Sequence, residues 1–277
     1  MRLLYLSKNM EGYSGALYQK EVMDELASQA RVSFYGPGFE EYNPKDTISR
    51  VIAKKGGRFD AIIMGHSWLS DLQGADVDPH PNLNLESIET PKIILLNKEY
   101  VNLREKLAYI KKVRFDIGFT HHHDADLYAE VTGTHFIFWP FAFNRSKYRD
   151  AASRKNIDFA FSGILQNQNS EAEQSDSRVK AMKLLFYSFA DIPIAKRPEY
   201  ASYNFFWNGR PRHRWARKLS RSVGRHKFLL DVEYRHLQMS SKVFLNTPSP
   251  VGLVSPRFFE CMAAGALVLC QESIDYQ

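Results

Sequence analysis

The segment 252–260 combines a small-residue loop with the start of a helix, an arrangement that suits a phosphate group. Ser255 is a favourable N-cap residue, and Pro256 fits the first helical position. A helix that begins here would present free backbone N–H groups and its positive dipole end to an anion. Gly252 would let the backbone approach a phosphate closely. The predicted phosphate-binding loop comprises Gly252, Leu253, Val254 and Ser255.

Two charged residues, Arg257 and Glu260, stand about one helical turn apart just after this loop. Arg257 can neutralise phosphate charge, and Glu260 can accept hydrogen bonds from two ribose hydroxyls. The alternative is an i,i+3 ion pair on the surface of an ordinary capped helix. The local pattern alone favours the surface pair.

Other polar residues follow predicted strands, and ligands of open α/β sheets bind beyond the carboxyl ends of the strands. A glycine-containing loop after the first strand and a Ser-Gly pair after a later strand are candidates for ligand contact. Side chains that can take a hydroxyl proton follow three further strands. The ligand-contact candidates are Gly12, Gly15, Ser162 and Gly163, and the proton-acceptor candidates are His66, Glu99 and Asp124.

The stretch 121–126, HHHDAD, suggests a second kind of chemistry. Histidine and aspartate together can bind a transition metal or Mn2+. Asp124 and Asp126 also have the D-x-D spacing with which some glycosyltransferases hold a metal–diphosphate. Against a metal, neighbouring histidines rarely converge on one ion, and Asp124 is well placed to cap the following helix. We favour the cap, and we predict no metal ligands.

The positive charge of the chain is local. The run 209–227 carries eight Lys or Arg and no acid, so the rest of the chain has a net charge of −2 against +6 for the whole. This run includes Trp215, and it can contact an anionic acceptor polymer, lipid headgroups or nucleic acid. The alternative is a solvated surface loop without a partner. No nucleic-acid-binding motif accompanies it, so we do not expect nucleic acid as a partner.

Composition places the 277-residue chain among ordinary globular proteins, with 44% hydrophobic and 25% charged residues. The two cysteines, Cys261 and Cys270, exclude a disulfide scaffold and favour core packing in a reducing compartment. No apolar run approaches the roughly 18 residues of a membrane span. We expect a cytoplasmic protein, at most peripheral at a membrane.

Short apolar runs alternate with helical patterns along the chain, which predicts βαβ units with parallel sheets. The expected strands are 2–7, 31–35, 60–64, 92–96, 115–120, 135–139, 157–162, 242–246 and 266–270, and the expected helices are 17–29, 48–55, 101–111, 125–131, 179–189, 228–240 and 257–264. The polar segment 146–156 predicts a linker between a domain at 1–145 and a domain at 157–277. Residues 191–227 have no clear period.

The segment 241–272 resembles the donor-binding segment of GT-B glycosyltransferases. Its match to the pattern R-x-F-E-x-x-A-x-G comprises Arg257, Phe259, Glu260, Ala263 and Gly265. It is most similar to the CgeB-like group, related to the glycosyltransferase group 1 (family 4-like) enzymes. The strand at 157–163 resembles the opening of the same family's second domain, and 135–144 the strand that ends its first domain.

This resemblance implies two Rossmann-like α/β domains facing a cleft. The first domain would bind the acceptor, and the second would bind the donor. The implied activity moves a sugar from a nucleoside-diphosphate sugar to a hydroxyl of a glycan or other glycoconjugate. No cofactor is required, and Mg2+ or Mn2+ is not expected, since Arg257 and the helix N-terminus would stabilise the leaving diphosphate.

Two departures from the family keep other functions open. The family often has a glutamate eight positions before the helix glutamate, where this chain has Gly252. The sequence ends at Gln277, just past a strand, so we expect a second domain shortened at its C-terminus. The alternatives are a metal-dependent glycosyltransferase that uses Asp124 and Asp126, or a non-catalytic domain that binds nucleotide or glycan.

Overall fold

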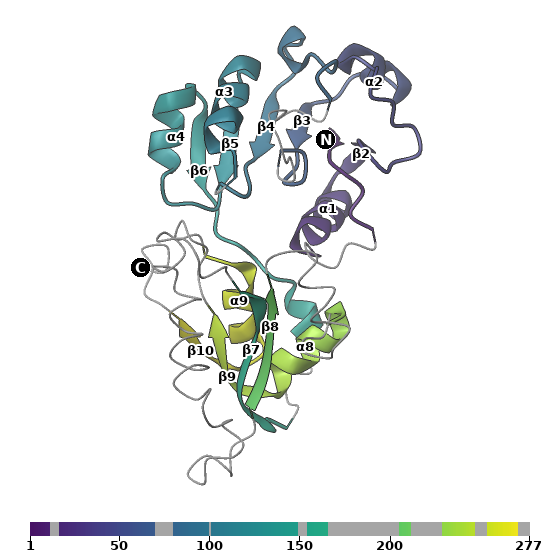
Figure 1. Ribbon diagram of the computed structural model, residues 1–277. Helices are drawn as coiled ribbons and strands as arrows, with labels where there is room; N and C mark the ends of the chain where they lie inside the picture. Colours follow the sequence, from purple (N-terminus) through teal and green to yellow (C-terminus); the bar gives the residue numbers. More distant parts are fainter. Residues whose placement is uncertain are drawn as a thin grey trace. The chain divides into compact units, whose positions relative to one another are not determined.

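A computed structural model describes residues 1–11, 17–69, 80–99, 101–148, 154–165, 205–211, 229–246 and 254–270 (Figure 1). The chain divides into two compact units, Met1–Pro140 and Phe141–Gln277. We call them the N-terminal unit and the C-terminal unit. Both are α/β units with a parallel sheet, as the alternating sequence pattern predicts.

Within the described part of the N-terminal unit, six parallel strands lie in the order β2-β1-β3-β4-β5-β6. Its strands are β1 (Arg2–Leu6), β2 (Arg31–Tyr35), β3 (Ala61–Met64), β4 (Lys92–Leu95), β5 (Ile117–Thr120) and β6 (His135–Phe138). Its helices are α1 (Leu17–Gln29), α2 (Ile48–Lys54), α3 (Leu103–Val113) and α4 (Ala125–Thr132), with a 3-10 turn, η2 (Leu85–Ser87). The strand order reverses beside β1, which places a topological switch point between β1 and β3.

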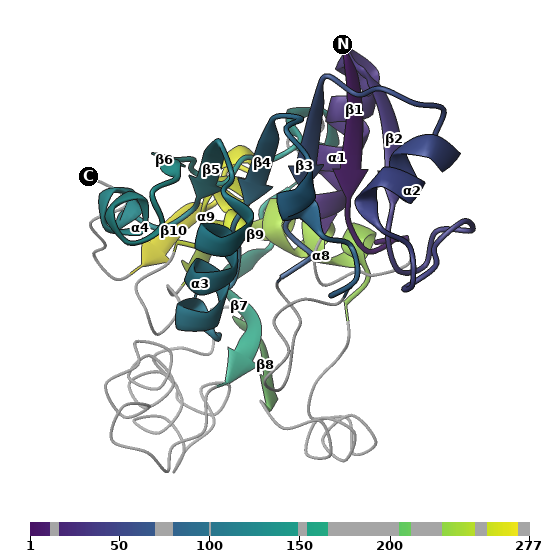
Figure 2. The same cartoon turned by 90° about the horizontal axis from the view of Figure 1, so that it is seen from above.

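Strand residues of this sheet alternate between two apolar layers. Leu4 and Leu6 of β1 belong to the core that includes residues of α2, α3 and α4. Leu3 and Tyr5 belong to the layer that includes residues of α1. The sheet is therefore covered on both faces (Figure 2), which explains why its strands are apolar runs rather than alternating polar and apolar residues.

Gly36, just after β2, is a position where only glycine fits. Its φ is +147°, and an added Cβ would lie 2.0 Å from the carbonyl oxygen of Ser7. We expect Gly36→Ala to lower the free energy of unfolding by about 1–3 kcal/mol for the backbone strain and by about as much again for the clash. The control is Gly57→Ala, because Gly57 has a φ of +94° and nothing within 4 Å of its Cβ position. Urea denaturation of the two variants should show the larger loss at Gly36; equal losses would contradict the clash.

The described residues of the C-terminal unit form four parallel strands in the order β10-β9-β7-β8. Its elements are η3 (Arg145–Tyr148), β7 (Ile157–Leu165), β8 (Phe205–Pro211), α8 (Asp231–Ser240), β9 (Ser241–Asn246), α9 (Pro256–Ala263) and β10 (Leu267–Cys270). Ala160 of β7, Phe244 of β9 and Cys261 of α9 form its core. Burial raises the pKa of Cys261 to about 12, so its thiol stays protonated, whereas Cys270 is only half-buried.

The described residues depart from the predicted elements most clearly in β7, in β8 and in the predicted linker. Strand β7 runs to Leu165 instead of ending at Ser162, because it pairs with β8 as far as Leu165 and Pro211. Strand β8 lies in the stretch for which no element was predicted. The segment 146–156, predicted as a linker, lies within the C-terminal unit, where Tyr148 is buried and donates to the Gln238 side chain at 3.1 Å. The predicted helix 179–189 lies outside the described residues.

Candidate functional site

The switch point of the N-terminal unit is marked by a pair of serines. Ser7 follows β1 and Ser67 follows β3, and their hydroxyl oxygens are 2.7 Å apart. The Ser67 hydroxyl also accepts the backbone N–H of Lys8 at 2.9 Å. These bonds tie together the carboxyl ends of the two strands where an open α/β sheet binds its ligand. Gly12 and Gly15, predicted to lie in the loop that follows, are outside the described residues.

Beside these serines, the structure brings together two histidines that are 55 residues apart in sequence. His66 follows β3 and His121 follows β5, and their Nε2 atoms are 3.0 Å apart. The two rings stack with centroids 5.1 Å apart, and the Trp139 ring stacks on both, at 6.0 Å and 5.9 Å. Both imidazoles are buried. The sequence nominated His66 as a proton acceptor and singled out His121 within the HHHDAD stretch, but it did not pair the two residues.

The hydrogen bonds fix which nitrogens carry protons. His121 Nδ1 lies 2.6 Å from the backbone carbonyl of Trp139, which can only accept, so this nitrogen carries the hydrogen. In neutral His121, Nε2 then accepts a hydrogen bond from His66 Nε2–H. His66 Nδ1 therefore carries no hydrogen and keeps its lone pair. That atom is buried and has no hydrogen-bond partner. Burial lowers the pKa of His66 well below 6.5 and that of His121 to about 4, so both rings are neutral at pH 7.

Glu99, which follows β4, is a second buried acceptor at the same sheet edge. The Thr120 hydroxyl donates to Glu99 Oε1 at 2.8 Å, while Oε2 is buried without a partner. The loop that carries Glu99 is fixed by buried Lys106, whose ammonium donates to the carbonyls of Asn97 and Lys98, each at 2.9 Å. Thus two of the predicted proton acceptors present unpartnered, buried acceptor atoms.

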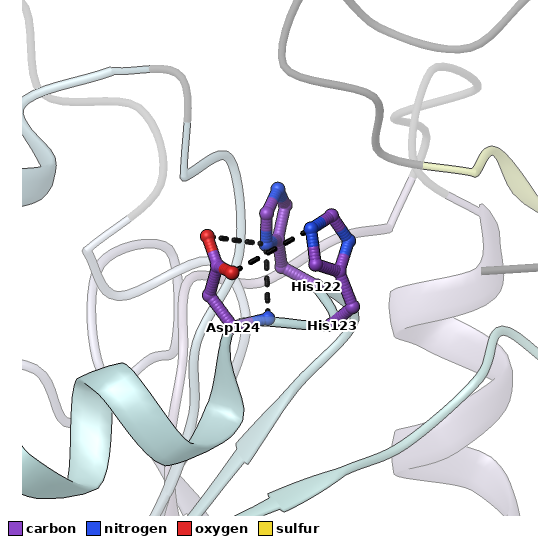
Figure 3. Close-up of side chains that lie close together, drawn as sticks. All are labelled: His122, His123 and Asp124. Atoms are coloured by element: carbon purple, nitrogen blue, oxygen red, sulfur yellow. Dashed lines mark hydrogen bonds and ion pairs between the residues drawn. The ribbon is translucent and has the colours of Figure 1, made fainter. Parts of the chain in front are cut away.

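The third predicted proton acceptor, Asp124, behaves differently from the prediction. It occupies the N-cap position of α4, but its side chain makes no capping hydrogen bond. Its carboxylate lies instead 3.3 Å from His122 Nδ1 and 3.5 Å from His123 Nε2 (Figure 3). The predicted side-chain cap is therefore wrong, because the two imidazoles that precede the helix take the carboxylate. Asp126, the other half of the D-x-D pattern, is exposed on the first turn of α4.

In the C-terminal unit, Ser162 and Gly163 lie where β7 parts from β9. The described pairing of β7 with β9 ends at Ala160, whereas pairing with β8 continues past both residues. Ser162 is buried. A Cβ at Gly163 would lie 2.8 Å from the Phe161 ring and 3.3 Å from Arg257 Nη1. The guanidinium of Arg257 therefore reaches the backbone of β7 at the switch point of this sheet.

The start of α9 lies close to Gly163, because Arg257 belongs to its first turn. Ser255 is the N-cap residue and Pro256 the first helical residue, as predicted, but the Ser255 hydroxyl makes no capping bond. It donates to Asn246 Oδ1 at 3.1 Å, at the end of β9. Asn246 Nδ2 and Arg257 Nε are both buried donors without a hydrogen-bond partner. Asn246 was not among the predicted site residues, although its place as the last residue of a strand would have nominated it.

Glu260 is held by a core glutamine. Its Oε2 accepts from Gln238 Nε2 at 3.2 Å, and Gln238 is itself fully buried. Gly265 follows α9 and its C-cap, and its φ of +69° is the left-handed conformation that this position predicts. Val254 is buried, whereas Gly252 and Leu253 lie outside the described residues. Most of the basic run 209–227 also lies outside the described residues, and only 209–211, the end of β8, is described.

None of the described helices combines the length and the apolar character needed to cross a bilayer. No protein-family model and no curated protein matches the chain, so the CgeB-like assignment stays a prediction.

Solved structures do resemble it. An α-glucosyltransferase in complex with UDP and a 13-mer DNA containing a central A:G mismatch has a TM-score of 0.60 and 11% identity over 97% of this chain and 78% of that chain. An α-glucosyltransferase with UDP and a 13-mer DNA containing a HMU base has a TM-score of 0.55 and 10% identity over 98% and 79%. HepE of Anabaena, in complex with UDP and glucose, has a TM-score of 0.46 and 12% identity over 99% and 81%. The first two likenesses establish the fold, which is that of GT-B glycosyltransferases, as predicted.

Proposed function

We propose that this chain is a glycosyltransferase that moves a sugar from a nucleoside-diphosphate sugar to a hydroxyl acceptor without a metal. One observation carries the proposal: at the carboxyl end of its own sheet, each unit has buried polar atoms without hydrogen-bond partners. The N-terminal unit offers the acceptor atoms His66 Nδ1 and Glu99 Oε2, and the C-terminal unit offers the donor atoms Asn246 Nδ2 and Arg257 Nε. Unpaired buried polar atoms are costly, and ligand groups of opposite hydrogen-bonding character would satisfy them.

On the donor side, the proposed ligand is the diphosphate. Arg257 provides positive charge next to the backbone of Gly163, and the N-terminus of α9 adds its dipole. These groups would stabilise the negative charge that develops on the leaving diphosphate, the task for which other enzymes use a metal ion. Ser162 and Gly163 would line the phosphates, together with the loop 252–255, and Glu260 would accept the ribose hydroxyls.

On the acceptor side, the proposed ligand is a hydroxyl group. The lone pair of His66 Nδ1 would accept its hydrogen, because His121 and the Trp139 carbonyl hold the ring in the tautomer that leaves this nitrogen bare. A general base of this kind contributes about 10²–10⁴-fold to a rate. Glu99 would hold a second hydroxyl of the same ligand. A glycan or other glycoconjugate offers such neighbouring hydroxyls.

The donor is tested first by nucleotide binding. Thermal-shift measurements with UDP, GDP, ADP, CDP and TDP would each be made with Mn2+ and with EDTA. UDP is the first choice, since the structural neighbours are named with UDP. A shift that survives EDTA supports metal-independent donor binding. A shift only with Mn2+ would select the metal-dependent alternative, and the absence of any shift would overturn the proposal.

The acceptor is tested by turnover. Release of the nucleotide from its sugar would be followed with a panel of oligosaccharides and glycoconjugates, and with a 13-mer DNA containing a HMU base, because one structural neighbour is named with such DNA. Glycan-dependent release supports the proposal. Release only with DNA would contradict the expectation that nucleic acid is not a partner, and binding without release would indicate a non-catalytic domain.

The proposed cytoplasmic location rests on the two free cysteines.

We expect Glu260→Ala to weaken nucleoside-diphosphate binding. Loss of hydrogen bonds to a charged acceptor costs about 1.5–3 kcal/mol, which corresponds to an increase in Kd of roughly 10- to 100-fold. Isothermal titration calorimetry measures the change, and a control variant, Glu130→Ala, removes an exposed glutamate from α4. If Glu260→Ala binds the nucleotide as tightly as the wild type, Glu260 is not a ribose ligand.

A further inference from the structure

We propose that His122, His123 and Asp124 form a binding site for a divalent transition metal of the zinc class. The three residues connect β5 to α4, and one potential ligand atom from each lies within 4.8 Å of the other two. Figure 3 shows both imidazoles on the same side as the carboxylate. This site goes beyond the proposed sugar transfer and does not depend on it, because that transfer is assigned to other side chains.

The nitrogen–oxygen distances match the ligand spacing of a tetrahedral ion. Zinc binds histidine nitrogen and carboxylate oxygen at about 2.0–2.2 Å, so neighbouring ligands of a tetrahedral ion lie about 3.3–3.5 Å apart. His122 Nδ1 lies 3.3 Å from Asp124 Oδ2, and His123 Nε2 lies 3.5 Å from Asp124 Oδ1, so each imidazole has this spacing to a different oxygen of the carboxylate. Two nitrogens and one oxygen suit zinc, cobalt or nickel better than magnesium or calcium, which prefer oxygen ligands alone.

The surroundings also suit an ion. The His122 side chain is 8% exposed, whereas those of His123 and Asp124 are 37% and 42% exposed, which leaves one side open for entry and for a water ligand. The backbone N–H of His122 donates to the Thr120 hydroxyl at 3.1 Å, which anchors the loop. The Asp124 carboxylate is not used as a helix cap, so binding a metal would cost α4 no side-chain cap.

Existing interactions of the two imidazoles, whose ring centroids lie 4.2 Å apart, would have to change. The backbone N–H of Asp124 donates to His122 Nδ1 at 3.2 Å, and that nitrogen would turn its lone pair to the metal. The N–H lies at the N-terminus of α4, where water can replace the long hydrogen bond. Asp126 takes no part in the cluster, so the site differs from a D-x-D pair that holds a metal–diphosphate.

The test uses full-length, tag-free protein dialysed against EDTA and then against metal-free buffer. It is titrated with Co2+ at pH 7.5, where tetrahedral Co2+ gives visible absorption bands, and then with Zn2+ as competitor. We expect one equivalent of Co2+ to bind and Zn2+ to displace it. No visible band with Co2+ and no heat with Zn2+ would overturn the site.

Variants assign the ligands. His123→Asn and Asp124→Asn should each raise the Zn2+ dissociation constant at least 10-fold, and both side chains are exposed enough to be replaced without a folding defect. Asp126→Asn and His135→Asn are the matched controls, since both residues are exposed and outside the cluster. Equal weakening by a control, or unchanged binding in both cluster variants, would place the metal elsewhere and refute the proposal. A thermal melt of each apo-variant verifies that it is folded.

Discussion

Arg257→Ala is expected to lower kcat about 100- to 1,000-fold, the usual cost of removing one group that stabilises developing negative charge. Arg257 is proposed to face the leaving diphosphate from the first turn of α9, with its guanidinium beside Gly163. Its Nε is buried without a hydrogen-bond partner, while its guanidinium carbon lies 5.9 Å from the centre of the Tyr234 ring, a contact that the substitution also removes. Nucleotide release from the donor sugar, measured at saturating donor, gives kcat directly.

The control for Arg257 is Arg235→Ala. Arg235 lies on α8 of the same unit, and its guanidinium is 2.8 Å from Asp231, which gives it a structural partner. This variant should lose some stability and keep its kcat. If Arg257→Ala turns over like the wild type, or if Arg235→Ala loses as much activity, Arg257 has a structural role only, as in the surface-pair hypothesis.

His66→Gln is expected to lower kcat by about 10²–10⁴-fold while the nucleotide Kd stays within a few-fold of the wild type. A glutamine amide can still donate to His121 Nε2, as His66 Nε2–H does, but it has no atom in the role of the bare Nδ1. The substitution therefore removes the proton acceptor and keeps the contact that holds the two rings together. Turnover and calorimetry on the same preparation separate the two effects.

His80→Gln controls for the loss of a buried imidazole. His80 is also fully buried and uses one ring nitrogen, Nε2, on a backbone carbonyl, that of Asp46, at 2.8 Å. The His80→Gln variant should lose about as much stability as His66→Gln, and it should retain the kcat of the wild type. Because burial lowers the pKa of His66 well below 6.5, the base stays unprotonated and wild-type kcat/KM should be constant between pH 8 and pH 6.5. A kcat loss in His80→Gln as large as in His66→Gln would contradict the assignment of His66.

Most of the framework could be predicted from the sequence, because strands buried on both faces are apolar throughout. Leu3–Leu6 and Ala61–Met64 are buried along their length, and such runs stand out between helical patterns. Strand β8 could not be predicted in this way. Its sequence, FFWNGRP, ends in glycine, arginine and proline, and it joins a basic run that dominates the local composition.

The candidate site was predicted in part, for a physical reason. A rule about strand ends nominates His66 and Glu99, since it depends only on where each strand stops, whereas Arg257 was nominated by its place at the start of a predicted helix. The roles of these residues depend on contacts between distant parts of the chain. The tautomer of His66 is set, through His121, by the backbone carbonyl of Trp139. The Asp124 carboxylate contacts two imidazoles and does not cap its helix. The Trp139 carbonyl is 73 residues from His66, so local sequence could not indicate that contact, whereas His122 and His123 directly precede Asp124.

The strand orders have a consequence for how the protein forms during its synthesis. In the N-terminal unit, β2 pairs with one side of β1, β3 with the other, and β4, β5 and β6 each add outward to the strand before it. In the C-terminal unit, β8 and β9 flank β7, and β10 adds to β9. In neither described sheet must a later strand insert between two strands that are already paired. Since chains emerge at about 5–20 residues per second, each new strand can join an open edge as it leaves the ribosome.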